Sequence, residues 1–584
     1  MDKDNAKKEY LERMRHSASH VMAQAVLNLF PKTKLGIGPA IENGFYYDFE
    51  FDKPISDEDL VKIGKEMKEI IKQKLPFNQK LLSRKEAEAY LKEAKQDFKL
   101  DLLEDIPDKK LSFYVTGKEK FMDLCRGPHM ETTGKIGAIK LERIAGAYWK
   151  GDEKNLMLTR IYGLAFETKK ELDEYLELKE KLKLADHRRI GKQMDLFSFH
   201  DEAPGMAFWH PKGQKLLNNL YKYWREVHER EGYIEVRTPE LLTVDTWRRS
   251  GHTQTFKEKM YMAQTNDSTV NNYACKPMNC DGGMIIYKTK QRSYKDLPIK
   301  MGELGVVHRY ESSGEVHGLL RVREFTQDDA HIYCSPDQVK EEIKKVIDLC
   351  LEFYDTFGLD LHHIELSTKP ENAIGSDEVW ERAESIMSEI LEEGDIDHLV
   401  TEGEGAFYGP KFDFHLSDSM GRTWQCGTIQ LDFAQPENFE LEYVDENGEK
   451  QRPVMLHRVI YGSIERFVSI LLEHYVGNLP LWLAPEQVRM IPIADRHVKY
   501  AKEVMKKYKN SGIVIAIDDR NETMQSRIRE AEIERVPYML VVGDKEIENN
   551  TVSVRPLTKK DQGMVDTDTF LKLILKEIFN KEHE

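Results

Sequence analysis

The stretch from His308 to His331, HRYESSGEVHGLLRVREFTQDDAH, constrains the fold more than any other part of this chain. If residues 320–333 are extended, successive side chains point to opposite faces of a sheet. One face would carry a row of polar side chains, and the other face is only partly apolar. A strand with its polar face exposed to solvent is therefore the alternative interpretation. The pattern predicts a strand whose polar face forms the floor of a site. That face carries Arg321, Arg323, Phe325, Gln327, Asp329 and His331.

Two further polar residues, Arg309 and Glu311, lie on an earlier run of the same stretch. The segment SSGEVHG follows them, and its Ser and Gly content predicts a turn or a mobile loop. We therefore expect a hairpin with candidate functional side chains on both of its strands.

Length and composition indicate a multidomain enzyme of the cytoplasm. A chain of 584 residues exceeds the roughly 250–300 residues that one core usually supports. No apolar stretch approaches the roughly 20 residues that span a bilayer, and the N-terminus lacks the apolar core of a secretory signal. Six cysteines are too few for a disulfide framework, so we expect thiols or metal ligands in a reducing compartment. The net charge of -16 argues against nonspecific nucleic-acid binding, but it leaves room for a locally basic patch.

The N-terminal part carries two pairs of potential ligands. Residues 6–30 have the pattern of an amphipathic helix, which places His16 and His20 on one face. Cys125 and His129 repeat the spacing around a Gly-Pro turn. These four groups could form a tetrahedral zinc site, or they could be unrelated polar positions.

The rest of the chain divides into a charged linker and two further domains. Residues 167–195 predict a solvated linker helix, and FWHPKG marks the entry to a new domain. The segment IEVRTPELL predicts an edge strand with Pro239 inside it. Helices are expected in EEIKKVIDLCLEFYDTFGL and, capped by Ser463, in SIERFVSILLEHYV. The segments AFYGPKFDFHL, RTWQCGTIQLDF and RPVMLHRVIYG predict strands. From about Glu486, strands alternate with helices, which predicts a small α/β domain with a largely parallel sheet.

Three features of the chain together resemble the three motifs of class II aminoacyl-tRNA synthetases: Arg309 with Glu311, the Pro239 strand, and Arg466 in GSIERF. Five further segments are similar to the threonyl-tRNA synthetase family in particular: CKPMNC, RVREFTQDDAH, AFYGPK, CGTIQLDF and VMLHRVIYGSIERF. The resemblance runs from about His16 to the C-terminus. It implies an α+β multidomain protein with an α+β editing domain (1–166), a linker helix (167–197), an antiparallel-sheet catalytic domain (198–484) and an α/β anticodon-binding domain (485–584).

The resemblance implies activation of threonine by ATP with Mg²⁺ and transfer to tRNA(Thr). Because two anions must meet during adenylate formation, guanidinium groups, which donate bidentately to phosphate and carboxylate, suit the reaction. By resemblance, Arg309 holds the α-phosphate, Glu311 reads adenine and Arg466 grips the γ-phosphate end. The resemblance also places a set of residues around the activated amino acid: Arg321, Gln327, Asp329, Tyr408, Lys411, Gln425 and Gln430.

The residues alone suggest a closed zinc site of Cys275, Cys280, His331 and Cys334. However, His331 and Cys334 are three apart on an extended segment and point to opposite faces, which disfavours that site. The resemblance implies an open zinc held by Cys280, His331 and His457, which binds the amino and hydroxyl groups of threonine. Valine lacks the hydroxyl, and such recognition can discriminate by about 10⁴ or more. Asp329 would take the substrate ammonium.

Serine keeps the hydroxyl, and one missing methyl is worth only about 1–3 kcal/mol. We therefore expect a second, hydrolytic site. The N-terminal residues resemble the family's editing site, which is thought to work without metal, so this interpretation replaces the zinc site there. The implied editing set is His16, His20, Tyr47, Lys99, Asp123, Cys125 and His129. In the C-terminal domain, Asn521, Glu546 and Arg555 match positions that read anticodon bases.

The chain departs from the family pattern at three places. Asp281, Gly282 and Gly283 stand where Pro-Gly-His usually follows the metal-binding cysteine, and the basic run near Arg555 is reduced to PLTKKD. The small ubiquitin-like domain that commonly precedes the editing domain is not in this sequence. We expect a homodimer formed through the Pro239 region and no membrane partner. The competing hypotheses are a noncatalytic tRNA-binding or regulatory paralogue and a different amino-acid specificity.

Overall fold

The structure is a computed structural model that describes residues 2–117, 121–266, 272–394 and 396–583. It divides into two compact units, Met1–Glu180 and Lys181–Glu584. Among the described residues, no helix has the length and apolar character needed to cross a membrane.

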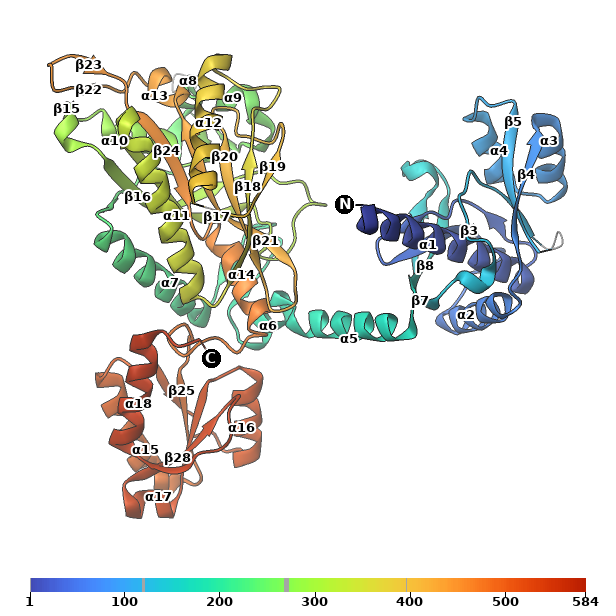
Figure 1. The fold of residues 1–584 in the computed structure, drawn as a ribbon. Coiled ribbons are helices and arrows are strands. Elements are labelled where there is room, and N and C mark those ends of the chain that lie inside the picture. Colours follow the sequence, from blue (N-terminus) through green and yellow to red (C-terminus); the bar gives the residue numbers. More distant parts are fainter. Residues whose placement is uncertain (1, 118–120, 267–271, 395, 584) are drawn as a thin grey trace. The chain divides into compact units, whose positions relative to one another are not determined.

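In the described part of the first unit, helices pack beside two antiparallel sheets (Figure 1). The larger sheet contains β1 (Lys34–Leu35), β3 (Gly44–Glu50), β8 (Met157–Phe166) and β7 (Ala138–Tyr148), with β2 (Ala40–Ile41) paired to β3. The smaller sheet contains β4 (Phe77–Ser83), β5 (Lys110–Thr116) and β6 (Phe121–Leu124). The helices are α1 (Asp2–Leu29), α2 (Asp57–Lys72), α3 (Arg84–Glu93) and α4 (Asp97–Glu104). The N-terminal helix expected at residues 6–30 is therefore confirmed.

The predicted linker helix at 167–197 is not continuous. Helix α5 (Lys169–Ala185) ends before Asp186, whose side chain accepts a hydrogen bond from the Arg188 amide and caps α6 (His187–Gln193). A capping side chain starts a new helix because it satisfies amides that have no partner in the preceding helix. The prediction of one linker helix is wrong in this respect.

An eight-stranded, mostly antiparallel sheet organises the second unit (Figure 1). The strand order is β11 (Ile234–Glu235), β16 (Ile299–His308), β17 (Glu324–Cys334), β24 (Val454–Val459), β21 (Thr423–Asp432), β20 (Lys411–Ser417), β18 (Asp360–Ser367) and β19 (His398–Thr401). One face packs on α7 (Pro211–Arg230), α11 (Val339–Thr356), α12 (Asp377–Glu393) and α14 (Ile464–His474). On the other face, Met301, Tyr333 and Met455 pack against α10 (Cys280–Tyr287), and polar side chains lie beside them.

Two strand predictions needed correction. Strand β17 begins at Glu324, so Arg321 and Arg323 precede it and do not continue its alternation. The segment IEVRTPELL forms two short strands, β11 and β12 (Leu241–Thr243), and Pro239 lies between them. Proline cannot donate a ladder hydrogen bond, which is consistent with a break at that point.

The second unit also contains shorter elements. The helices are α8 (Val244–Arg249), α9 (His252–Thr255), α10 (Cys280–Tyr287) and α13 (Ala434–Asn438). The strands are β9 (Phe197–Ser198), β10 (Phe208–Trp209), β13 (Met262–Ala263), β14 (Tyr273–Cys275), β15 (Arg292–Ser293), β22 (Tyr443–Val444) and β23 (Lys450–Gln451).

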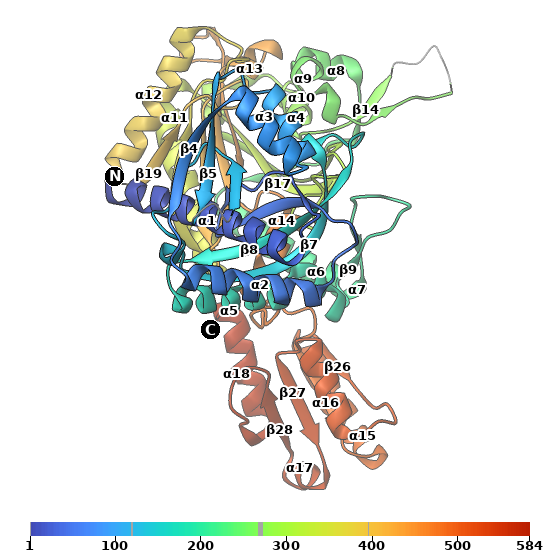
Figure 2. The same ribbon diagram turned by 90° about the vertical axis from the view of Figure 1, so that its right-hand side faces the viewer.

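The C-terminal part of this unit is an α/β fold with a five-stranded sheet. Figure 2 shows its helices beside the strands. Its elements are β25 (Val488–Pro492), α15 (Val498–Asn510), β26 (Ile515–Ile517), α16 (Met524–Ile533), β27 (Tyr538–Val542), α17 (Asp544–Asn549), β28 (Thr551–Pro556), β29 (Gly563–Asp566) and α18 (Thr567–Asn580). Strand β25 pairs in parallel with β26 and β27, but β28 pairs antiparallel with β27 and β29. The sheet is mixed, not largely parallel.

Candidate functional site

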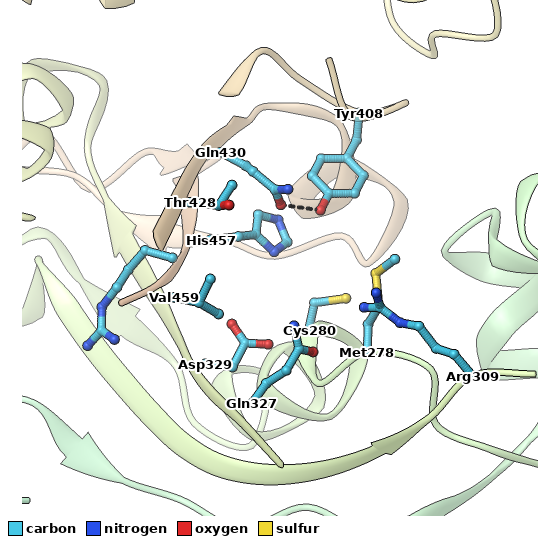
Figure 3. Close-up of a pocket in the computed structure, with 11 residues that line it drawn as sticks. Met278, Cys280, Arg309, Gln327, Asp329, Tyr408, Thr428, Gln430, His457 and Val459 are labelled. Carbon is cyan, nitrogen blue, oxygen red and sulfur yellow. Dashed lines mark hydrogen bonds between the residues drawn. The ribbon is translucent and has the colours of Figure 1, made fainter. Parts of the chain in front are cut away.

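A cavity of about 240 Å³ opens on the polar face of the large sheet (Figure 3). One water occupies roughly 30 Å³ in the liquid, so the cavity has room for a small molecule. Its lining residues come from β17, β21, β24 and the segments beside them. They are Met278, Cys280, Arg309, Gln327, Asp329, Tyr408, Thr428, Gln430, His457, Arg458 and Val459.

Arg309 presents a cation to this cavity. It follows the last residue of β16, and its Nε donates to the carbonyl oxygen of Pro277 at 3.1 Å. Its guanidinium carbon lies 5.5 Å and 5.1 Å from the ring centroids of Phe256 and Phe325. Burial lowers the pKa of Arg309, but a guanidinium remains protonated at neutral pH. The site can therefore bind an anion through a fixed, charged fork.

The other predicted ATP-binding residues lie outside the cavity lining. Glu311 is buried and accepts a hydrogen bond from Lys259 Nζ at 3.1 Å. Arg466 lies in the first turn of α14, and its buried Nε has no hydrogen-bond partner among the described residues. Arg321 is 51% exposed and pairs with Glu315 at 3.6 Å. The structure therefore does not bring Arg321 into the cavity.

The three predicted zinc ligands come from three separate elements. Cys280 begins α10, and His331 in β17 is the register partner of His457 in β24. The two imidazole centroids are 5.0 Å apart, and the buried Nε2 of His331 has no hydrogen-bond partner among the described atoms. Nε2 of His457 lies 2.7 Å from Asp432 Oδ2, which leaves Nδ1 free to bind. These three side chains are of types that bind metals. In the described chain, four groups of side chains have ligand atoms that all lie within 4.8 Å of one another, and these three residues are not one of those groups.

The closed zinc site is not supported by the geometry. Cys334 packs in the apolar core on the opposite face of β17, and its Sγ faces the Val454 carbonyl oxygen at 3.8 Å. Cys334 and His331 thus point to opposite faces of β17, as alternation along a strand predicts.

Asp281, one of the departures from the family pattern, is fully buried beside Cys280. Its Oδ1 lies 3.4 Å from Cys280 Sγ and 3.9 Å from Nδ1 of His252, while its Oδ2 has no partner among the described residues. Burial raises the pKa of Asp281 to about 7. The departure therefore adds a buried carboxyl group to the wall of the candidate metal site, which sequence reasoning did not identify.

The predicted amino-acid pocket is only partly assembled. Tyr408 donates to Gln430 Oε1 at 2.5 Å (Figure 3) and stacks on His457 with centroids 4.8 Å apart. Asp329 accepts from Asn279 at 3.3 Å, and burial raises its pKa to about 6. Gln327 also lines the cavity, whereas the predicted Lys411 and Gln425 are not in its lining.

Several lining residues were missed by sequence reasoning. Thr428 and Val459 are register partners on β21 and β24, and Arg458 follows His457. Alternation along β21 from Gln430 could have suggested Thr428. Met278 lies in a loop, and no periodic signal in the sequence indicates it.

A buried carboxyl group at the start of α14 should make stability depend on pH. Glu465 Oε2 accepts from the Thr326 amide at 3.0 Å, and desolvation raises its pKa to about 7. In the unfolded chain the value is about 4.3. Between these two pH values only the unfolded state ionises, so stability falls as pH rises from about 4.3 to 7.

We expect Glu465→Gln to remove this term. The loss of unfolding free energy between pH 5 and pH 8 should be smaller in the variant than in the parent by about 2 kcal/mol. Urea unfolding followed by tryptophan fluorescence at both pH values measures the difference. Identical pH dependence in the two proteins would show that Glu465 is not buried in this way.

The seven predicted editing residues lie together in the first unit. Asp123 accepts a hydrogen bond from Tyr47 at 2.5 Å, pairs with Lys99 at 2.8 Å, and lies 3.9 Å from Nε2 of His20. Cys125 Sγ lies 3.3 Å from Nε2 of both His16 and His129. A cavity of about 440 Å³ opens beside His16.

Desolvation keeps the imidazoles and the thiol of this cluster uncharged. It lowers the pKa of His16, His20 and His129, and it raises the pKa of Cys125 to about 11. At neutral pH the cluster therefore offers neutral imidazoles and a thiol beside the Lys99–Asp123 ion pair. Neutral imidazoles can accept a proton from water.

The three predicted anticodon residues lie in different environments. Asn521 is exposed in the loop before α16. Arg555 in β28 pairs with Asp561 at 3.6 Å. Glu546 is buried and accepts from the Gly543 amide at 2.9 Å and from Ser553 Oγ at 2.8 Å. Glu546 thus already has partners at the start of α17.

Comparison with known families matches three segments of the chain. Residues 261–475 match the tRNA synthetase class II core domain (G, H, P, S and T), and residues 487–577 match an anticodon binding domain. Residues 111–162 match the threonyl and alanyl tRNA synthetase second additional domain.

Curated relatives are similar over nearly the whole chain. The threonine–tRNA ligase of Caldanaerobacter subterraneus subsp. tengcongensis is 53% identical over 567 residues, which cover 97% of this chain and 87% of the relative. The threonine–tRNA ligase of Acetivibrio thermocellus is 52% identical over 570 residues, covering 97% and 89%.

Two solved structures are also similar. The RNA binding domain of threonyl-tRNA synthetase from Cryptosporidium parvum has a TM-score of 0.65 at 37% identity, covering 67% of this chain and 98% of that one. A threonyl-tRNA synthetase from Aeropyrum pernix has a TM-score of 0.60 at 28% identity, covering 68% and 97%.

Proposed function

This chain belongs to the threonyl-tRNA synthetase family, and from this premise we propose how its residues carry out the family's reactions. The enzyme attaches threonine to tRNA(Thr) through a threonyl-adenylate, uses ATP with Mg²⁺, and carries the editing domain that removes serine. The predicted fold class, class II core with editing and anticodon-binding domains, is confirmed. A noncatalytic paralogue is not favoured, because relatives named as ligases match 97% of the chain.

The fixed guanidinium of Arg309 in the cavity wall carries the proposal for the activation step. A threonine carboxylate oxygen attacks the α-phosphorus, and the bond to pyrophosphate breaks. Arg309 would hold the α-phosphate throughout, while Arg466, with an unpartnered Nε at a helix N-terminus, would bind the γ-phosphate. Glu311 would bind adenine. Such catalysis consists mainly of positioning and charge stabilisation.

We propose that Cys280, His331 and His457 hold a zinc ion. The unpartnered Nε2 of His331 and the Asp432 contact of His457 support this assignment, since metal-binding histidines usually donate their other N–H to a carboxylate. When bound, zinc would supply a Lewis acid for the amino and hydroxyl groups of threonine. Asp329 would hold the ammonium group. Of the residues predicted to complete the pocket, Gln327, Tyr408 and Gln430 line the cavity, whereas Arg321, Lys411 and Gln425 do not.

Editing would use water activated by the N-terminal cluster. A neutral imidazole of His16, His20 or His129 would take a proton as the water oxygen attacks the seryl ester carbonyl. The carbon–oxygen bond to tRNA then breaks, and the ribose oxygen takes up a proton. Lys99 and Asp123 would orient the ester and the water.

We also propose a homodimer located in the cytoplasm. Ile234 and Leu241, on the two sides of Pro239, are 54% and 49% exposed, and β11 is an edge strand of the large sheet. Exposed apolar residues at a sheet edge are typical of a pairing surface.

tRNA recognition would involve Asn521, Glu546 and Arg555, and Glu546 would have to leave its present partners to read a base.

Amino-acid-dependent pyrophosphate exchange tests the proposed function. We expect rapid exchange with threonine, about 10⁴-fold or more lower kcat/KM with valine, and only about 10- to 200-fold lower kcat/KM with serine. The contrast arises because valine leaves the polar site unsatisfied, whereas serine lacks only a methyl group. Absence of exchange with threonine would overturn the proposal.

A further inference from the structure

A second cluster of metal-binding side chains lies on the same sheet, away from the cavity lining. His363 and Glu365 are in β18, and His415 is in β20. Ile364 and Phe414, the neighbours in sequence, are buried in the core. Because side chains alternate along a strand, the three polar residues share the opposite, polar face.

Strand pairing brings these three residues together. His363 is the register partner of His415, and Glu365 is two residues further along β18. Cross-strand partners have Cβ atoms about 4.5–5.5 Å apart, which is close enough for two imidazoles to share one ligand. A register shift beside His363 accommodates His362 as an extra residue.

The donor atoms already converge. One ligand atom from each of the three residues lies within 4.8 Å of the other two. The imidazoles of His363 and His415 are stacked at 4.4 Å with an interplanar angle of 9°, and His415 Nε2 lies 3.2 Å from Glu365 Oε2. All three residues are partly exposed, so an ion could reach them from solvent.

The other groups of this kind in the described chain are already explained. In the group of Asp186, His187 and Glu473, both imidazole nitrogens of His187 have partners: Nδ1 contacts Glu473 at 2.6 Å and Nε2 accepts from the Leu319 amide. The group of His252, Cys280 and Asp281 shares Cys280 with the proposed zinc site. The fourth group is the editing cluster.

We propose that His363, Glu365 and His415 bind a divalent transition-metal ion, with zinc as the best match. Two imidazoles and one carboxylate form a typical set of three protein ligands for zinc, and they leave a fourth position for water. Bound there, the ion would link β18 to β20. The site shares no residue with the proposed threonine site and does not depend on it.

Metal stoichiometry tests this site. The full-length protein is dialysed against a chelator and titrated with Zn²⁺ in competition with a chromophoric chelator. We expect His363→Ala combined with His415→Ala to bind one ion fewer per chain than the parent. A matched control is His398→Ala on neighbouring β19, whose Nδ1 contacts a backbone carbonyl oxygen outside the cluster; it should bind as many ions as the parent.

Two further measurements separate this result from trivial causes. Threonine-dependent exchange should be the same in the double variant and in the parent. A failure of the proposed function would show as absence of exchange in the parent itself, whatever the zinc stoichiometry. Glu365→Gln, which keeps the side-chain shape, should weaken zinc binding at this site about 10-fold or more. Equal ion counts in the parent and the double variant, or unchanged affinity in Glu365→Gln if the double variant does not fold, would overturn the proposal.

Discussion

Replacing Arg309 with alanine should lower kcat/KM for threonine-dependent pyrophosphate exchange by about 10²–10³-fold. This is the usual cost of removing one preorganised donor from a transition state that develops charge. Arg309 lines the cavity, is held by the Pro277 carbonyl oxygen, and lies near two aromatic rings, so no rearrangement is needed before it binds phosphate. Initial exchange rates at several ATP concentrations measure the effect.

Two variants show whether the effect depends on the guanidinium. Arg309→Lys keeps the charge but loses the bidentate fork, and it should recover only part of the activity. Arg248→Ala removes an exposed arginine that pairs with Asp245 outside the cavity, and it should behave like the parent. If Arg309→Ala exchanged pyrophosphate at the parental rate, the assignment of the α-phosphate site to this residue would be wrong.

The combination of His16→Ala and His20→Ala should slow deacylation of seryl-tRNA(Thr) by about 10²–10⁴-fold, the typical contribution of a positioned acid or base. Both imidazoles belong to the cluster around Asp123 and Cys125, and both are held neutral by burial. Threonine-dependent exchange should not change, because these residues are in the other unit. Hydrolysis of preformed, labelled seryl-tRNA measures the rate.

Asn28→Ala is a matched control on the same helix. Asn28 donates to Glu66 at 2.7 Å on the exposed side of α1, and its loss should leave deacylation unaltered. A double histidine variant that still hydrolysed seryl-tRNA at the parental rate would refute the assignment of the editing site.

The fold was largely predictable where the signal is local. The helices at the N-terminus and after Ser463 were expected from periodicity and capping, and the strands β20, β21 and β24 from their β-branched and aromatic content. Two predictions failed for different reasons. Periodicity did not reveal that β28 would pair antiparallel with β27, because that pairing is long-range. The second helix in the linker begins at a local signal, the Asp186 side chain that caps α6.

The candidate site shows the same division. Alternation along β17 placed Gln327 and Asp329 on one face and separated His331 from Cys334, and the structure has this arrangement. Alternation also placed Arg321 in the row, but the strand begins later and Arg321 turns to Glu315. A strand's limits depend on its partners, which local sequence does not specify.

The sequence by itself determined the family, the order of the domains and the side chains that share a face within each strand, because these follow from motifs and local periodicity. Only the tertiary structure decided which strands are neighbours. It therefore decided that His363 meets His415. It also brought helices α9 and α10 together, so that Asp281 lies between Cys280 and His252. The physical reason is that strand register is set by packing and hydrogen bonding between segments far apart in the chain, whereas alternation is a property of each strand alone.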